Sequence, residues 1–132
     1  MNQTEGTPMT ELRMRIQRED NLNDVYYEDI VGPGNGRHHY VIARNTENEG
    51  EQQILADIQF QNGARNEINS VAGVLEADLL EIVRHRLQCF NEGEFRTREN
   101  ACALTHIEEA LMWLNKRKDD RKERQVLGTY NK

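Results

Sequence analysis

The sequence predicts an α+β fold, in which antiparallel β-strands near the N-terminus are followed by two C-terminal α-helices, the last one long. Runs of β-branched and aromatic residues, and one run with a period of two, lie in the first half of the chain. The second half repeats apolar residues at spacings of three and four, the period of a helix. Because strands come first and helices last, the order favours α+β over an alternating α/β architecture.

The first two predicted strands are "VYYEDIV", residues 25–31, and "RHHYVIA", residues 37–43. Both are rich in the β-branched and aromatic residues that favour strands. "GPGNG", residues 32–36, breaks the chain between them. We interpret this glycine-rich segment as a turn rather than a phosphate loop, because it does not lead from a strand into a helix.

A third strand is predicted at "ILADIQF", residues 54–60, where apolar and polar residues alternate. Asn62 and Gly63 are expected to end it in a turn. One predicted face of this strand carries Ile54, Ala56, Ile58 and Phe60.

Two helices follow an irregular segment. The first is predicted over residues 75–90 and ends before the tight link "NEGEF". Thr97 is expected to cap the second helix, which extends to about Gln125 before Gly128 ends the pattern. The apolar positions of the first helix are Leu75, Leu79, Ile82, Val83, Leu87 and Phe90.

The sequence divides into a polar beginning and a longer remainder. Residues 1–24 contain few large apolar side chains, and we interpret them as a flexible N-terminal arm, with a short interaction helix as the lesser alternative. Residues 25–132 are expected to form a single α+β domain. The hydrophobic fraction of 36% lies below the usual ~45–50%, so part of the stability is expected from self-association.

Charge and composition limit the class of partner. The formal net charge of −6 argues against nucleic-acid polymers and anionic membranes. No stretch reaches the ~18 apolar residues of a membrane span and no secretory segment is evident, so we expect a soluble, intracellular protein. Cys89 and Cys102 lack metal spacing and are interpreted as reduced thiols.

The motifs of common enzymes are missing: the sequence has no GxSxG, HExxH, paired CxxC or Walker loop. His38 and His39 are neighbours on a predicted strand and would point to opposite faces. His85 and His106 have no partner at ligand spacing. The sequence therefore predicts no catalytic residue, no metal and no cofactor.

Asn100 lies on the apolar stripe of the second helix, together with Leu104, Ile107, Leu111 and Leu114. Either it bonds to the neighbouring loop or assists the cap, or it lines a cavity and bonds a polar ligand. Arg117 suits phosphate oxygens, but at about 1.5 Å per residue it lies roughly 25 Å from Asn100. Two antiparallel helices around a two-fold axis would bring Asn100 of one chain near Arg117 of the other.

Phe90, just before the link, has two interpretations: packing in the core, or a stacking platform for a base.

Three segments carry a resemblance to a known family: "DIQFQNG", "LLEIVRHRLQCFNEGEF" and "RENACALTHIEEALMWLNKRKDDRKERQVLGT". Together they resemble the phage-encoded Thoeris anti-defence sponge family. The resemblance implies a non-enzymatic α+β protein assembled as a dimer or a higher oligomer, up to a hexamer. It implies binding of a cyclic ADP-ribose isomer made by bacterial TIR-domain proteins, held uncleaved. Some members also bind cyclic dinucleotides and trinucleotides at separate sites.

The resemblance also implies a set of pocket residues, with Leu79 as an apolar wall and two arginines beside glycine-containing turns. "RQVLGT" stands where "RGVEGT" is usual, and Arg96 and Thr97 stand where relatives often carry small residues and cysteine, which leaves the ligand range open. The implied ligand-binding residues are Phe90, Asn100, Arg117, Arg37, Arg65 and Leu79.

The leading hypothesis is thus a sponge in the cytoplasm of an infected bacterial host, with residues 25–132 as the ligand-sequestering domain. One alternative is a protein–protein interaction module or regulator that uses the amphipathic helices. Another is a cyclic nucleotide hydrolase with His38, His39 or His106 as the base.

Overall fold

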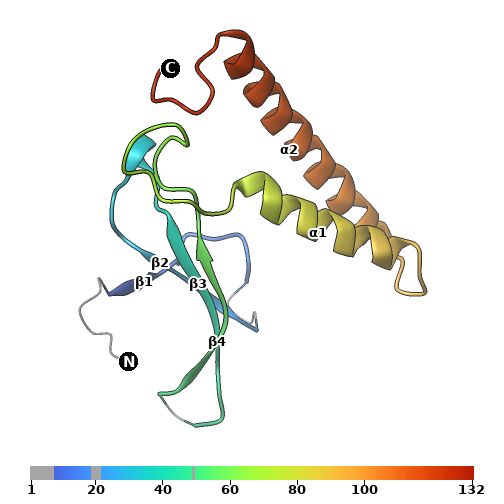
Figure 1. The fold of residues 1–132 in the computed structure, drawn as a ribbon. Coiled ribbons are helices and arrows are strands. Elements are labelled where there is room, and N and C mark those ends of the chain that lie inside the picture. The colour runs from blue at the N-terminus through green and yellow to red at the C-terminus, as the bar shows by residue number, and fades with distance from the viewer. Residues whose placement is uncertain (1–7, 19–21, 49) are drawn as a thin grey trace. The chain divides into compact units, whose positions relative to one another are not determined.

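The first half of the chain folds into a four-stranded antiparallel sheet with strand order β1-β2-β3-β4 (Figure 1). The computed structural model describes residues 8–18, 22–48 and 50–132. Two helices follow the sheet, so the predicted α+β class, with antiparallel strands first and a long last helix, is confirmed. The strands are β1 (Met9–Glu11), β2 (Asp24–Glu28), β3 (His39–Asn45) and β4 (Gln52–Gln59).

The structure divides into two units. The sheet unit comprises the described residues up to Gly63 together with residues 71–73, and the hairpin unit comprises residues 64–70 and 74–132. The single domain predicted for residues 25–132 stays a prediction.

Strand β1 lies within the segment interpreted as an N-terminal arm. Met9, Thr10 and Glu11 pair with residues of β2, so this stretch is a strand and the alternative of a short helix here is wrong. The ragged apolar spacing offers no continuous helical face, whereas the edge of β2 offers backbone hydrogen-bonding groups. Residues 1–7 and 19–21 of the predicted arm lie outside the described residues, and its mobility stays a prediction.

A β-bulge changes the predicted faces of β4. Ala56 pairs with Ile42, but Ile54 pairs with the next residue of β3, Ala43, so Leu55 is the extra residue. A bulge of one residue reverses the side-chain alternation beyond it. Ile54 therefore shares a face with Ala43 rather than with Ala56 and Ile58, and its predicted place on their face is wrong.

The two faces of the sheet differ in character. On one face the Tyr40 ring lies between Tyr27 and Phe60, with ring centroids 6.4 and 5.5 Å away. Edge-to-face and tilted contacts of this kind add to the stabilisation from buried area. On the other face Val41 is 9% exposed and Ala43 is fully buried. The sheet thus has apolar packing on both sides of β3.

The glycine-rich segment forms the turn that the sequence predicts. A 3₁₀ turn, η1 (Pro33–Asn35), joins β2 to β3, and the Gly32 amide donates to the Gly36 carbonyl at 2.9 Å. A Cβ atom on Gly32 would collide with the His38 ring. The imidazole therefore occupies space that only glycine leaves free.

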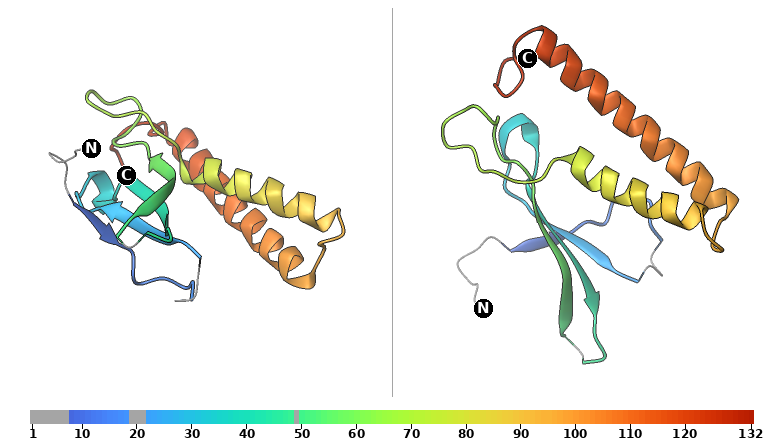
Figure 2. Two further views of the ribbon diagram at one scale, coloured as in Figure 1. Left: turned by 90° about the horizontal axis from the view of Figure 1, so that it is seen from below. Right: turned by 45° about the vertical axis from the view of Figure 1, so that its right-hand side comes forward.

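The two helices, α1 (Glu76–Asn91) and α2 (Arg98–Glu123), form an antiparallel hairpin (Figure 2). At the start of α1 the Asp78 carboxylate accepts from the Leu75 amide at 2.8 Å. At the start of α2 the Thr97 hydroxyl oxygen accepts from the Asn100 amide at 3.0 Å, which confirms the predicted N-cap. The helix ends at Glu123, slightly before the predicted Gln125.

The helix–helix interface uses the predicted stripe of α2 but only part of the predicted stripe of α1. Leu111 is 8% exposed, and the Arg84 guanidinium of α1 meets Glu108 of α2 at 2.9 Å. On α1, Ile82 and Val83 are 65% and 42% exposed. Half-buried positions on the helices include Leu80, Leu87, Leu104, Ile107 and Leu114.

Within the described ranges, no helix has the length and apolar character needed to cross a membrane.

Candidate ligand-binding site

Phe90 and Asn100 lie close to the link that joins α1 to α2. Phe90 is in the last turn of α1, and Asn100 is in the first turn of α2. Both side chains are half-buried. The short link "EGEFRT", residues 92–97, reverses the chain between them (Figure 1). We call this end of the hairpin the tip.

The structure gives Asn100 local partners. Its side-chain Nδ2 donates to the Phe95 carbonyl at 3.4 Å, a long hydrogen bond, while its backbone amide donates to the cap at Thr97. Of the two sequence interpretations, bonding to the neighbouring loop is present in the structure. Its Oδ1 accepts no hydrogen bond from any described residue, so an acceptor remains available there.

The Phe90 ring has a cationic neighbour one turn earlier. The guanidinium carbon of Arg86 lies 5.2 Å from the ring centroid, within the range of a cation–π contact. The ring is half-buried and therefore keeps part of its surface accessible. The Arg86 guanidinium covers part of the ring, and the rest of its face is left for another contact.

Arg117 and Leu79 lie far from the tip. Arg117 is exposed in the second half of α2 and forms no hydrogen bond or ion pair with the described residues. Leu79 is half-buried in the first turn of α1, about three turns before Phe90. Because the helices are antiparallel, both belong to the half of the hairpin opposite the tip. One chain does not bring Arg117 to Asn100.

Arg65 and Arg37 are placed differently from each other. Arg65 is exposed in the loop of residues 64–70 of the hairpin unit, and its side chain has no polar partner among the described residues. Arg37, in the sheet unit, is bound: its Nε donates to Asp29 at 2.8 Å and its Nη1 to the Asn35 carbonyl at 2.9 Å. Arg37 therefore braces the turn that contains η1.

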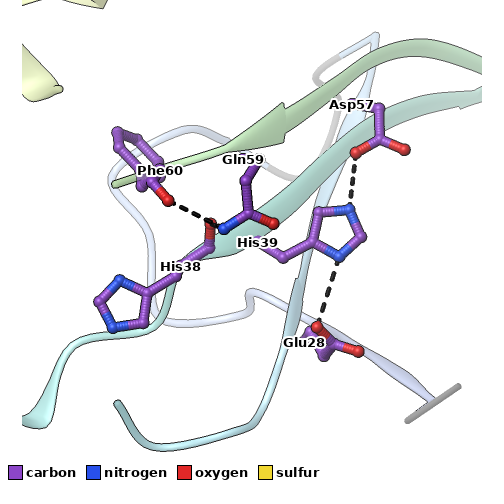
Figure 3. Close-up of polar contacts among 6 residues, drawn as sticks. All are labelled: Glu28, His38, His39, Asp57, Gln59 and Phe60. Carbon is purple, nitrogen blue, oxygen red and sulfur yellow. Dashed lines mark hydrogen bonds and ion pairs between the residues drawn. The ribbon is translucent and has the colours of Figure 1, made fainter. Parts of the chain in front are cut away.

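A polar cluster that the sequence analysis did not find lies on the sheet. His39 is flanked by carboxylates from the two neighbouring strands: Nε2 lies 2.6 Å from Asp57 and Nδ1 lies 3.5 Å from Glu28 (Figure 3). An imidazolium can donate from both nitrogens. The signal that could have found it is an acid, Asp57, on the polar face of the alternating strand β4, with a histidine on the neighbouring strand β3.

A cavity of about 290 Å³ lies beside this cluster. The His38 Nε2 atom is buried without a hydrogen-bond partner in the structure. The two adjacent imidazoles point away from each other, as alternation along a strand requires (Figure 3). Over residues 8–18, 22–48 and 50–132, no group of three or more His, Cys, Asp or Glu side chains can hold a metal ion. The cavity is lined by Glu28, Ile30, Val31, Gly32, Pro33, His38, His39, Gln59 and Asn62.

Both cysteines are free and exposed, with the Cys89 sulfur 3.8 Å from His85 Nε2.

Comparisons with known proteins agree on one family. The family model described as "Acb2/Tad1, hairpin domain" matches residues 52–118, which run from β4 through α1 into α2. The chain is also 39% identical over 127 residues to a protein of Bacillus phage SBSphiJ7 named Thoeris anti-defense 1. That alignment covers 96% of this chain and 74% of the phage protein. The chain therefore belongs to the Acb2/Tad1 hairpin-domain family of Thoeris anti-defence proteins.

Proposed function

We propose that the protein is a phage anti-defence sponge that binds a cyclic ADP-ribose isomer and holds it uncleaved in the cytoplasm of the infected bacterial host. Membership of the anti-defence family supports the role. The observation that carries the proposed mechanism is the split of the candidate residues between the two halves of the hairpin. Phe90 and Asn100 lie at the tip, and Leu79 and Arg117 lie in the opposite half.

Each group has a distinct task in the proposed pocket. The Phe90 ring stacks on the adenine, since an aromatic face accepts a base without needing a fixed hydrogen-bond pattern. The Arg117 guanidinium, unpaired among the described residues, forms charge-assisted hydrogen bonds to the pyrophosphate. The free Oδ1 of Asn100 accepts from a ligand hydroxyl or amine. Leu79 supplies an apolar wall. Arg65 is a further cationic contact, and a ligand role for Arg37, which is bound to Asp29 in the sheet unit, stays a prediction.

The pocket is completed by a second copy of the chain. Since Arg117 and Asn100 lie roughly 25 Å apart along α2, an antiparallel partner must supply one of the two. The helices also carry uncovered apolar side chains: Ile82 is 65% exposed on α1, and Trp113 is 65% exposed on α2. Surfaces of this kind mark interaction sites. We propose a homo-oligomer built on a dimer of hairpins, with a hexamer as the larger alternative.

A sponge works by mass action and needs no catalytic group. It must bind the signal more tightly than the host effector does and be present in excess, so that the free concentration falls below what the effector needs. The proposed complex uses no metal and no cofactor. The ligand is released from the protein without any chemical change.

Calorimetric titration tests the proposal. A panel of cyclic ADP-ribose isomers, with cyclic dinucleotides and trinucleotides alongside, is titrated into the native protein. At least one cyclic ADP-ribose isomer should bind tightly, and Arg117→Ala should weaken it by on the order of 100-fold, the equivalent of about 2.7 kcal/mol. Lys116→Ala, which removes the same charge from the adjacent exposed position, is the matched control and should bind as the native protein does.

Recovery of the ligand separates a sponge from an enzyme. After long incubation and heat denaturation, the intact cyclic molecule should be recovered quantitatively. Absence of binding by every isomer would refute the proposed ligand. Linear product that increases with protein concentration would refute the sponge.

A further inference from the structure

The chain that follows α2 folds back onto the last turns of that helix. We call residues 125–132 the C-terminal hook. The Arg121 Nη2 atom lies within hydrogen-bond distance of three hook carbonyls, those of Val126 at 3.1 Å, Thr129 at 3.2 Å and Asn131 at 2.8 Å. That nitrogen carries two hydrogens, so at least one is shared. Its guanidinium pairs with no carboxylate among the described residues, because it is committed to the hook.

Backbone hydrogen bonds fix the start of the hook. The Gln125 amide donates to the Lys122 carbonyl at 3.0 Å, and the Val126 amide donates to the Arg121 carbonyl at 2.9 Å. These two bonds together form a Schellman motif, which ends the helix and redirects the chain. Arg121 thus holds the hook twice, through its carbonyl and through its side chain.

The hook also holds a second segment of the hairpin unit. The Gly128 carbonyl accepts from the Asn66 amide at 2.8 Å, in the loop of residues 64–70. Gly128 has φ +81°, and a Cβ atom there would lie 2.6 Å from the Asn66 Nδ2 atom. Glycine adopts this conformation without strain, whereas another residue would be strained and its Cβ atom would displace the Asn66 side-chain amide.

Asn66 directly follows Arg65, whose own side chain has no polar partner in the described part of the chain. The backbone beside Arg65 is held by the hook and by a turn within its own loop, in which the Glu67 amide donates to the Ala64 carbonyl at 2.9 Å, and not by the arginine side chain. We propose that the C-terminal hook positions Arg65 for the ligand, with Arg121 and Gly128 as positioning residues. This inference rests on the proposed function. A loop that is ordered before binding loses less conformational entropy when the ligand binds, so the affinity is higher.

A double-mutant cycle tests the coupling. Arg121→Ala, Arg65→Ala and the double variant are titrated with the cyclic ADP-ribose isomer that the native protein binds best. Arg121→Ala should weaken binding about tenfold, the scale of ordering one long side chain. In the Arg65→Ala background it should change affinity no further, because the residue that it positions is gone. Fully additive losses would overturn the proposal.

A ligand-free measurement separates this inference from the proposed function. Amide hydrogen exchange at Asn66, resolved by NMR, should accelerate in Arg121→Ala and in Gly128→Ala, and remain unchanged in Lys122→Ala, which removes an exposed charge from the same turn. Unchanged exchange in both hook variants would refute the hook. Accelerated exchange in a protein that binds no isomer would refute Arg65 positioning and the proposed function together while leaving the hook in place. Gly128→Ala keeps Arg121, so the test survives if Arg121→Ala unfolds.

Discussion

Asn100 has two hydrogen-bonding groups that the structure treats differently. The amide nitrogen is tied to the Phe95 carbonyl of the link, and the amide oxygen has no partner among the described residues. An amide on an apolar stripe is therefore compatible with folding. Its nitrogen forms a hydrogen bond to the link, and the side chain is only half-buried, so its oxygen can still reach solvent. The amide oxygen is not used in a hydrogen bond to the described residues and can accept one from a ligand.

Neighbouring substitutions at the tip separate binding from stability. Thr97→Ala removes the N-cap and should lower the free energy of unfolding by about 1 kcal/mol, with little change in ligand affinity. Asn100→Ala should weaken ligand binding at least tenfold, since a ligand group would lose its hydrogen bond in a closed pocket, and its stability loss should be smaller. Urea denaturation and calorimetry measure the two effects. The same loss of affinity in both variants would assign Asn100 a structural role only.

The His39 cluster makes a residue-scale prediction for the sheet. His39→Ala removes the imidazole that lies between Glu28 and Asp57 and leaves two carboxylates without their shared partner. Because these side chains are partly exposed, the free energy of unfolding should fall by about 1 kcal/mol. His106→Ala, at an exposed position of α2, is the control for loss of an imidazole. Equal urea midpoints for the two variants would show that the cluster contributes nothing.

At the scale of the element, α2 ends in a conformation that its sequence does not favour. Gln125 has φ +59°, the left-handed region, at the position of the Schellman motif where glycine is usual. A residue with a Cβ atom costs roughly 1–2 kcal/mol in that region. The helix end tolerates this because two backbone hydrogen bonds and the Arg121 side chain hold the hook in place.

Gln125→Gly should therefore raise the stability of the protein. The expected gain in the free energy of unfolding is about 0.5–1 kcal/mol, which is the relief of strain less the extra backbone entropy of glycine in the unfolded chain. Gln125→Ala removes the same side chain and keeps the Cβ atom, so it should give no such gain. Thermal unfolding compares the two. A gain shared by alanine and glycine would attribute the effect to the side chain rather than the backbone.

The whole molecule has a small core. Among the described residues, the buried apolar side chains are those of Val41, Ala43 and Leu111. The face of α1 that carries Ile82 and Val83 is left largely uncovered. A chain with so little buried apolar area gains stability when a second copy covers the remainder.

Ile82→Glu should reduce the proposed oligomer to smaller species. A charge in a dimer interface costs several kcal/mol unless it is paired, whereas in a monomer the side chain is mostly in water. Ile16→Glu is the control, because Ile16 is fully exposed in the sheet unit and should leave the assembly intact. Light scattering at micromolar concentration distinguishes the species. If Ile82→Glu forms assemblies of the native size, α1 does not contribute to the interface.

A mixed dimer tests whether each pocket is shared between two chains. A dimer of one Asn100→Ala and one Arg117→Ala subunit, isolated with two different affinity tags, has one pocket with both native residues and one that lacks both. About half of the native binding capacity should return, measured as ligand bound per dimer. If each pocket belongs to one chain, both pockets keep one defect and no capacity returns.

The sequence by itself determined the types and order of the elements. Alternation in β4, helical periodicity in α1 and α2, and the cap at Thr97 are local signals, because each depends on residues a few positions apart. The tip also follows from local signals: two helices joined by a short link must place Phe90 and Asn100 near the turn. The residue types offered ligand binding as one of two interpretations of Phe90 and of Asn100, and the resemblance to a known family favoured that interpretation over the other.

Only the tertiary structure determined which side chains and backbone groups of each element are in contact with other segments. The bulge at Leu55, the carboxylates around His39 and the hook around Arg121 all join segments that are separated by turns or loops. Periodicity likewise cannot say which apolar side chains of α1 are covered, because that choice depends on how α2 packs against it. Hydrogen-bond partners and buried faces are properties of long-range pairing, which no local pattern in a single sequence encodes.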